Sequence, residues 1–146
     1  MKALIQRVLE STVKVEGKTV GAIGPGMLAL VAVEPQDGPQ QITKMANKLL
    51  GYRIFEDEAG KMNLSLTDTG GGLLLVSQFT LAADTRKGMR PSFSSAAEPA
   101  QAEALFNELA AMLKAQHPDI ETGRFGADMK VSLVNDGPVT FLLECS

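Results

Sequence analysis

Two almost uninterrupted apolar segments most limit what this chain can fold into. Met27–Val33 contains no polar residue, and Leu73–Gln78 begins with four consecutive aliphatic residues. Both segments have the length of a strand, and neither shows the alternation of apolar and polar residues that marks a strand with one face in water. Each is therefore predicted to be a strand that is buried on both faces.

The segments around these two strands predict the remaining elements. Thr12–Val15 and Thr19–Ile23 flank a short turn and are typical of a hairpin. Apolar residues recur at helical spacing within Ile42–Leu50 and Ala102–Leu113, which predicts two amphipathic helices. The length suits one domain, residues 1–146. We expect a mixed α/β fold in which largely antiparallel, barrel-like β-sheets are covered on one side by the two helices.

Local signals refine the last third of the chain. Pro99 suits the first turn of the second helix, and Ser95 with Glu98 has the spacing of a capping box. Beyond that helix, Met129–Val134 and Val139–Glu144 are predicted to be two strands joined by a turn.

The composition excludes several classes of protein. One His, one Cys and no Trp cannot build a metal site from several His or Cys ligands, and a single Cys cannot form an internal disulfide. No metal or cofactor is expected. His117 lies at the end of a predicted helix and Cys145 in a terminal strand, so both are interpreted as structural residues. We find no signal peptide and no apolar segment of membrane length, and therefore expect a cytoplasmic protein.

The charge distribution restricts how the chain could bind nucleic acid. The formal net charge of −3 argues against a generally basic nucleic-acid-binding protein, so any positive charge that contacts RNA must be local. Arg86, Lys87 and Arg90 form such a cluster in a segment without clear periodicity. The cluster is either an ordinary solvated charge run or a contact for phosphate groups.

Two further segments carry candidate chemistry. Ser77–Thr80 follows the second apolar strand directly, and polar side chains at the end of a buried strand are well placed to line a site. Strands also commonly end in Ser and Thr, so this segment alone identifies no function. Asn135–Thr140 is, by its composition, a turn between two strands.

Together these segments resemble the D-aminoacyl-tRNA deacylase family, also known as the D-tyrosyl-tRNA deacylase family. The two signatures are Ser77-Gln78-Phe79-Thr80-Leu81 and Asn135-Asp136-Gly137-Pro138-Val139-Thr140, and Gly88–Phe93 and Gly123–Phe125 also match. The resemblance extends over essentially the whole chain. The tail Glu144–Ser146 is not part of the pattern.

The resemblance implies a proofreading hydrolase that releases D-amino acids from tRNA. It also implies a homodimer with its active sites at the subunit interface. No membrane partner is expected, because the chain has no apolar segment of membrane length. Gly137–Pro138 is expected to be cis, to enter the partner's site, to bind the amino group of a D-residue and to clash with L side chains. Arg7 is expected to hold this segment, and Met129 to lie near the amino acid. Glycine has no side chain that could clash, so mischarged glycyl-tRNA is an expected second substrate.

The resemblance also implies roles for the two polar clusters. The expected catalytic pocket is lined by Ser77, Gln78, Phe79 and Thr80, and the expected tRNA contacts are Arg86, Lys87 and Arg90. The Thr80 hydroxyl is a weak nucleophile without a partner base, so the ribose 2′-hydroxyl of the substrate is expected to assist. The backbone N–H groups of Phe79 and Thr80 would then stabilise the oxyanion, and Gln78 would position the substrate. Two alternatives are a small-molecule esterase or amidase that uses Thr80 or Ser77, and a non-catalytic dimeric binding module.

Overall fold

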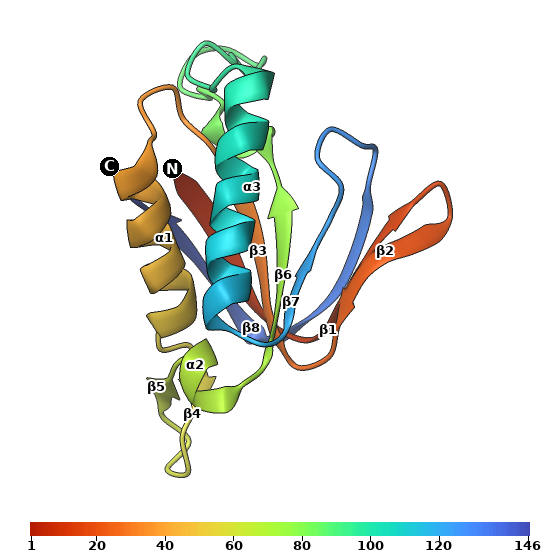
Figure 1. Ribbon diagram of the computed structural model, residues 1–146, viewed down its shortest axis with the longest axis vertical. Coiled ribbons are helices and arrows are strands. Elements are labelled where there is room, and N and C mark those ends of the chain that lie inside the picture. Colours follow the sequence, from red (N-terminus) through yellow and green to blue (C-terminus); the bar gives the residue numbers. More distant parts are fainter.

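The computed structural model describes residues 1–146, and its strands form one large sheet and a small hairpin (Figure 1). Five strands of the large sheet follow the order β2-β1-β3-β6-β7, and β8 pairs with the free edge of β1. The strands of this sheet are β1 (Lys2–Val15), β2 (Lys18–Ile23), β3 (Gly26–Ala32), β6 (Gly72–Ser77), β7 (Ile120–Thr122) and β8 (Lys130–Glu144). The hairpin consists of β4 (Phe55–Glu56) and β5 (Met62–Leu64).

The two apolar segments form β3 and β6, which pair in parallel at the centre of the sheet. Their alternate residues face two different cores. Met27 and Leu73 belong to a large core on one face of the sheet, whereas Leu28 and Leu74 belong to a smaller core on the other face. All four side chains are at most 1% exposed. The prediction of strands buried on both faces is therefore confirmed.

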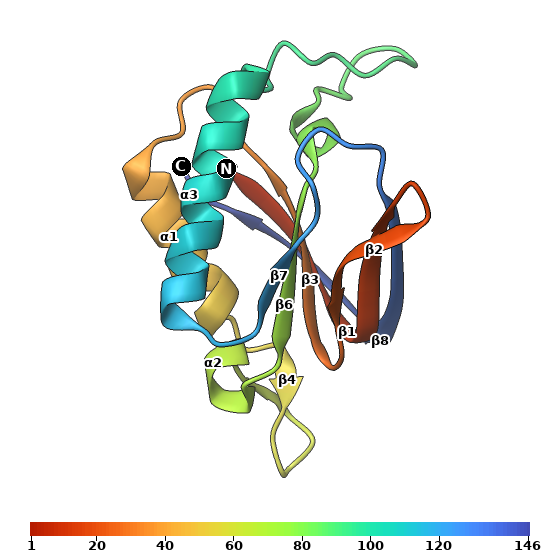
Figure 2. The same cartoon turned by 45° about the vertical axis from the view of Figure 1, so that its right-hand side comes forward.

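The sheet curls because β1 changes its partner along its length. The first half of β1 pairs with β3 and the second half with β2, while β8 follows β1 on its other edge. The curl brings β2 towards β7 (Figure 2). A Cβ atom on Gly21 would lie 2.6 Å from the carbonyl oxygen of Thr122, so this close approach requires glycine. The sheet thereby takes the expected barrel-like shape.

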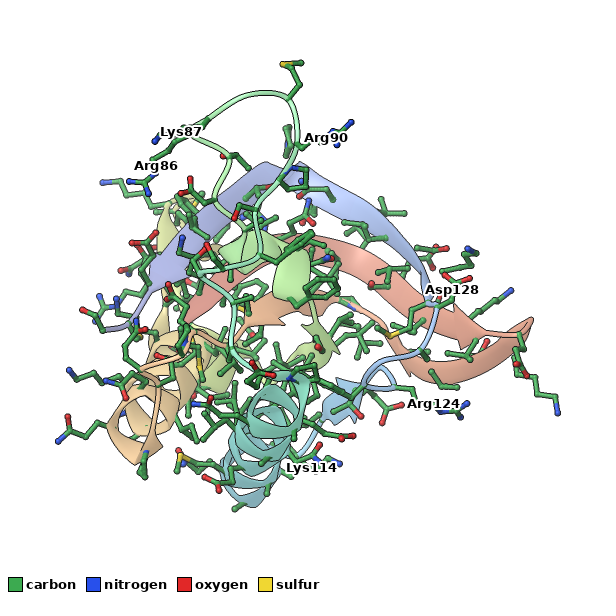
Figure 3. All side chains as sticks on the ribbon, turned by 90° about the horizontal axis from the view of Figure 1, so that it is seen from above. Arg86, Lys87, Arg90, Lys114, Arg124 and Asp128 are labelled. Carbon is green, nitrogen blue, oxygen red and sulfur yellow. The ribbon has the colours of Figure 1, made fainter.

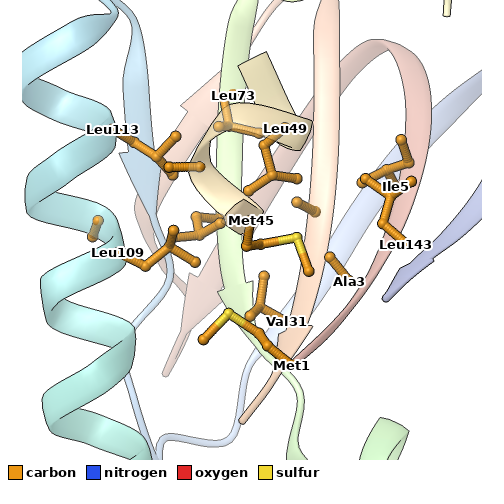
Figure 4. Close-up of a cluster of buried hydrophobic side chains, with 14 of the residues drawn as sticks. Met1, Ala3, Ile5, Val31, Met45, Leu49, Leu73, Leu109, Leu113 and Leu143 are labelled. Carbon is orange, nitrogen blue, oxygen red and sulfur yellow. The ribbon is translucent and has the colours of Figure 1, made fainter. Parts of the chain in front are cut away.

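Two helices, α1 (Pro39–Gly51) and α3 (Pro99–Gln116), cover one face of the sheet as predicted (Figure 1). Proline begins both helices, where its fixed φ is suitable and its missing N–H is not needed. Leu49 of α1 and Leu109 of α3 pack towards Leu73 of β6, and all three are completely buried (Figure 4). No helix of the chain is both long enough and apolar enough to cross a membrane.

The structure differs from the predicted helices in two places. A short third helix, α2 (Leu66–Thr69), was not predicted. It forms because Ser65 and Asp68 exchange bonds of 3.1 Å and 2.9 Å between their side chains and backbone N–H groups. The capping box expected from Ser95 and Glu98 is wrong. The Ser95 hydroxyl donates instead to a backbone carbonyl of the segment after β6, and Glu98 is an N-cap without a side-chain bond.

Candidate active site

A pocket of about 440 Å³ opens at the carboxyl end of β6. Ser77 ends this strand, and Gln78 and Phe79 continue the pocket wall, with Phe79 starting the short 3₁₀ helix η1 (Phe79–Ala82). The other walls come from residues at and just before the start of α3 and from the segment that runs from β7 into β8: Ala97, Pro99, Ala102, Phe125, Gly126, Ala127, Asp128, Met129 and Val131. The structure therefore brings Ser77, Gln78 and Phe79 together with Met129.

The segment that follows β6 is held to the sheet by its backbone. The N–H of Gln78 donates to the carbonyl of Val31 at 2.8 Å, which continues the pairing with β3 beyond Ser77. The side-chain amide of Gln78 donates to the hydroxyl of Thr80. Thr80 is exposed and does not line the pocket. Its hydroxyl has no imidazole or carboxylate partner, so nothing in its bonding activates it as a nucleophile.

Met129 is positioned by the segment between β7 and β8. This segment is attached to β6 because the N–H of Gly123 donates to the carbonyl of Leu75 at 3.0 Å. A Cβ atom on Gly123 would lie 2.7 Å from the sulfur of Met129, so the glycine makes room for that side chain. Sequence reasoning missed this wall apart from Met129. The match at Gly123–Phe125 was the available signal, but it did not show that the segment lies beside Ser77.

Gly137 and Pro138 lie in an exposed bulge of β8, and the peptide bond between them is cis. Residues on both sides of the bulge pair with β1, so β8 is one strand and the predicted strand–turn–strand arrangement is wrong. Asn135 closes the bulge. Its side-chain oxygen accepts from the N–H of Val139 at 3.1 Å, and its amide donates to the hydroxyl of Thr140 at 3.0 Å.

Arg7 anchors this bulge from β1. Arg7 is buried, with 7% of its surface exposed. Its guanidinium donates to the backbone carbonyls of Asp136 at 3.0 Å and Ile54 at 2.9 Å. It also lies 3.5 Å from the carboxylate of Asp136. Because Gly137 follows Asp136 directly, Arg7 is bonded to the residue immediately before the cis peptide bond.

Within one chain the bulge and the pocket are far apart. Arg7, beside the bulge, pairs with Met27 on β3, whereas Ser77 lies opposite Val31 on the same strand. The four-residue step from Met27 to Val31 corresponds to about 13 Å along β3. The three strand spacings from β8 through β1 and β3 to β6 add about 14 Å across the sheet. The structure therefore does not bring Gly137 and its neighbour into the pocket of their own chain.

The predicted basic cluster lies on the exposed loop after η1 (Figure 3). Arg86 donates twice to the carboxylate of Asp84, at 2.9 Å and 2.8 Å. These bonds hold the pKa of Asp84 well below its usual range and raise the pKa of Arg86. Lys87 and Arg90 form no ion pair. Of the three cations, only these two therefore keep a charge without an acidic partner.

The single His and the single Cys lie away from the pocket. His117 follows the C-terminal end of α3, whereas the start of that helix lines the pocket. Its Nε2 is 2.6 Å from the carbonyl of Gly71, and the residue is 5% exposed. Cys145 is also buried. Both residues are therefore buried and contribute nothing to the pocket wall.

Comparisons with known proteins agree with the motifs. The family model described as D-Tyr-tRNA(Tyr) deacylase matches residues 4–144. A D-aminoacyl-tRNA deacylase of Teredinibacter turnerae is 68% identical over 144 residues, which cover 99% of each chain. The solved c-Myc DNA Unwinding Element Binding Protein is 40% identical with a TM-score of 0.96, covering 100% of this chain and 99% of that one. A probable eukaryotic D-amino acid tRNA deacylase shares the fold at 17% identity, with a TM-score of 0.81 over 97% of both chains.

Proposed function

Because this chain belongs to the D-Tyr-tRNA(Tyr) deacylase family, we propose that the pocket at the end of β6 is its active site. The family reaction is hydrolysis of the ester bond between a D-amino acid and tRNA. The observation that carries the assignment is the meeting of the signature residues Ser77, Gln78 and Phe79 with Met129 around one pocket. We place the enzyme in the cytoplasm because charged tRNA is its substrate.

The chemistry that we propose uses backbone amides and the substrate itself. Phe79 and Thr80 begin η1, and the first N–H groups of a helix have no acceptor within it. Both N–H groups are therefore assigned to the oxyanion that develops during ester hydrolysis. Gln78 positions the substrate, and the ribose 2′-hydroxyl next to the ester assists the attacking water. This assignment requires no base on the protein.

Substitution of Thr80 tests this mechanism. T80A is expected to retain turnover within about tenfold of the wild type, because it keeps the backbone N–H and loses only a hydroxyl without a base. T80S, which keeps the hydroxyl, is the matched control. Abolished turnover in T80A, with T80S active and with folding and tRNA binding intact, would show that the side chain is the nucleophile.

We further propose that the chain acts as a homodimer in which the Gly137–Pro138 bulge of one copy enters the pocket of the other. The separation of bulge and pocket within one chain supports this arrangement. A suitable surface is also present, because β8 pairs on one edge only and exposes Val134, Phe141 and Leu142 by 44%, 37% and 49%. Large exposed apolar side chains next to an unpaired strand edge are typical of subunit contacts.

Chirality is proposed to be read by the backbone of this bulge. A rigid backbone that clashes with every L side chain excludes L-aminoacyl-tRNA regardless of which amino acid it carries. Packing preferences alone would supply only about 1–3 kcal/mol of discrimination. Glycyl-tRNA has no side chain to exclude and is the proposed second substrate. The expected result is rapid release of D-Tyr and Gly from tRNA and negligible release of L-Tyr. Equal rates for D-Tyr and L-Tyr would contradict the proposal.

Mixing two inactive variants tests the shared site. G137V places a side chain on the bulge, and Q78A alters the pocket wall. In a mixed dimer one of the two sites carries both changes and the other carries neither. Co-refolding equal amounts is therefore expected to restore about a quarter of the wild-type activity, since half of the dimers are mixed. A mixture no more active than its two components, with mixed dimers confirmed by mass, would exclude a site built from two chains.

A further inference from the structure

The charged residues on the segments that follow β6 and β7 are unequally paired. Arg86 is bound to Asp84, and Lys130 lies 3.2 Å from both carboxylate oxygens of Asp128. Arg124 is exposed and makes no ion pair. A cation beside a pocket retains its full attraction for an anionic ligand only when no carboxylate already neutralises it.

Arg124 lies at the edge of a pocket wall. The five residues that follow it, Phe125 to Met129, all line the pocket. The carbonyl of Arg124 accepts from the N–H of Ala127 at 3.2 Å, and Gly126 adopts a positive φ of 76°, so this stretch is a defined turn. Figure 3 shows Arg124 on the same segment as Asp128. In that view, the loop of Arg86–Arg90 lies on the opposite side of the molecule. Arg124 and the basic loop therefore lie on different sides of this end of the molecule, and only Arg124 directly adjoins a run of pocket-lining residues.

We propose that Arg124 binds a backbone phosphate at the 3′ end of the aminoacyl-tRNA. This inference rests on the proposed active site. An ester held in the pocket places the terminal ribose at its mouth, and the phosphodiester that links the terminal nucleoside to the preceding one is only one sugar away. A guanidinium has a planar fork of donors that matches phosphate oxygens and never loses its charge. Arg124 is thus a substrate-binding residue at the edge of the pocket wall formed by Phe125 to Met129.

The test measures KM and kcat for D-Tyr-tRNA over a range of salt concentrations. R124Q is expected to raise KM several-fold, leave kcat unchanged and reduce the slope of log KM against log salt by about 0.7, the value for one phosphate contact on a single strand. R124K keeps the charge and is expected to keep the slope. The matched control is K114Q. Lys114 is an exposed, unpaired cation about 22 Å along α3 from Pro99, so its loss is expected to change neither parameter.

A phosphate-free substrate separates this inference from the function on which it rests. On the 3′-D-tyrosyl ester of adenosine, R124Q is expected to match the wild type, because the group that Arg124 binds is missing. Equal KM and salt slope for R124Q and wild type on tRNA would overturn the assignment, as would equal losses on tRNA and on the adenosine ester. If the wild-type chain hydrolyses neither substrate, the proposed function itself is refuted, and the role of Arg124 with it.

Discussion

Replacing Arg7 by Met tests whether a buried cation sets the position of the bulge that we propose reads chirality. Methionine keeps most of the apolar length of the arginine side chain but has no donor. R7M therefore leaves the carbonyls of Ile54 and Asp136 without the guanidinium that bonds to them at 2.9 Å and 3.0 Å. The first bond is buried and the second is only partly buried, so the two losses are unequal.

The expected cost follows from these environments. A hydrogen bond to a charged group contributes about 1.5–3 kcal/mol when buried, and we assign about 2 kcal/mol to Ile54. The two contacts between Arg7 and Asp136 are more exposed, and we assign about 1 kcal/mol to them together. They are the bond to the Asp136 carbonyl and the 3.5 Å contact with the Asp136 carboxylate, which is 45% exposed. The sum, about 3 kcal/mol, corresponds to a decrease in Tm of about 6–12 °C for a chain of this size. The hydrogen bond to Asp136 also holds the residue before Gly137. Loss of its contribution of about 1 kcal/mol is therefore expected to reduce discrimination between D- and L-substrates about fivefold.

Two measurements check this prediction. Thermal unfolding gives the change in stability, and the ratio of kcat/KM for D-Tyr-tRNA and L-Tyr-tRNA, measured well below Tm, gives the discrimination. K14M is the matched control, because Lys14 is an exposed cation on the same strand without an ion pair. If R7M lowers Tm but leaves the D/L ratio unchanged, Arg7 supports the fold without positioning the bulge. An unchanged Tm would contradict the energies assigned to the two bonds.

Three further predictions concern other parts of the molecule. If Lys87 and Arg90 each bind a phosphate of the tRNA, as the resemblance implies, their joint replacement by Gln is expected to reduce the slope of log KM against log salt by about 1.4–1.8. An unchanged slope would show that neither residue contacts tRNA. Because Arg86 holds the pKa of Asp84 low, the pair persists as the pH falls through the usual Asp range and is lost only near the lowered pKa. In R86Q, carboxyl NMR is expected to show a higher pKa for Asp84 that stays below the usual Asp value, because the backbone N–H of residue 86 still donates to this carboxylate; an unchanged pKa would contradict the role of the guanidinium. Leu75 is fully buried on a central strand, so L75A is expected to lower the free energy of unfolding by about 2–5 kcal/mol in denaturant titration, and a loss below 1 kcal/mol would show that the core rearranges to fill the space.

The features that sequence reasoning predicted correctly depend on neighbouring residues. The two strands buried on both faces follow from uninterrupted apolar runs, and α1 and α3 follow from apolar residues at helical spacing. Errors arose where a distant partner decided the outcome. Ser95 does not cap α3 because its hydroxyl reaches a carbonyl in the segment after β6. The predicted turn at Asn135–Pro138 is a bulge within one strand because β1 pairs with both flanks.

The sequence by itself determined the fold class, the family and the identity of the signature residues. Only the tertiary structure decided how those residues are distributed in space. It placed Met129 beside Ser77, set the Gly137 bulge at the other end of the sheet and paired Arg86 with Asp84 while leaving Arg124 unpaired. Periodicity and motifs report the preference of a segment for a local conformation. The strength of an ionic contact, and the site to which a segment contributes, depend on groups brought close by strand pairing and by the curl of the sheet.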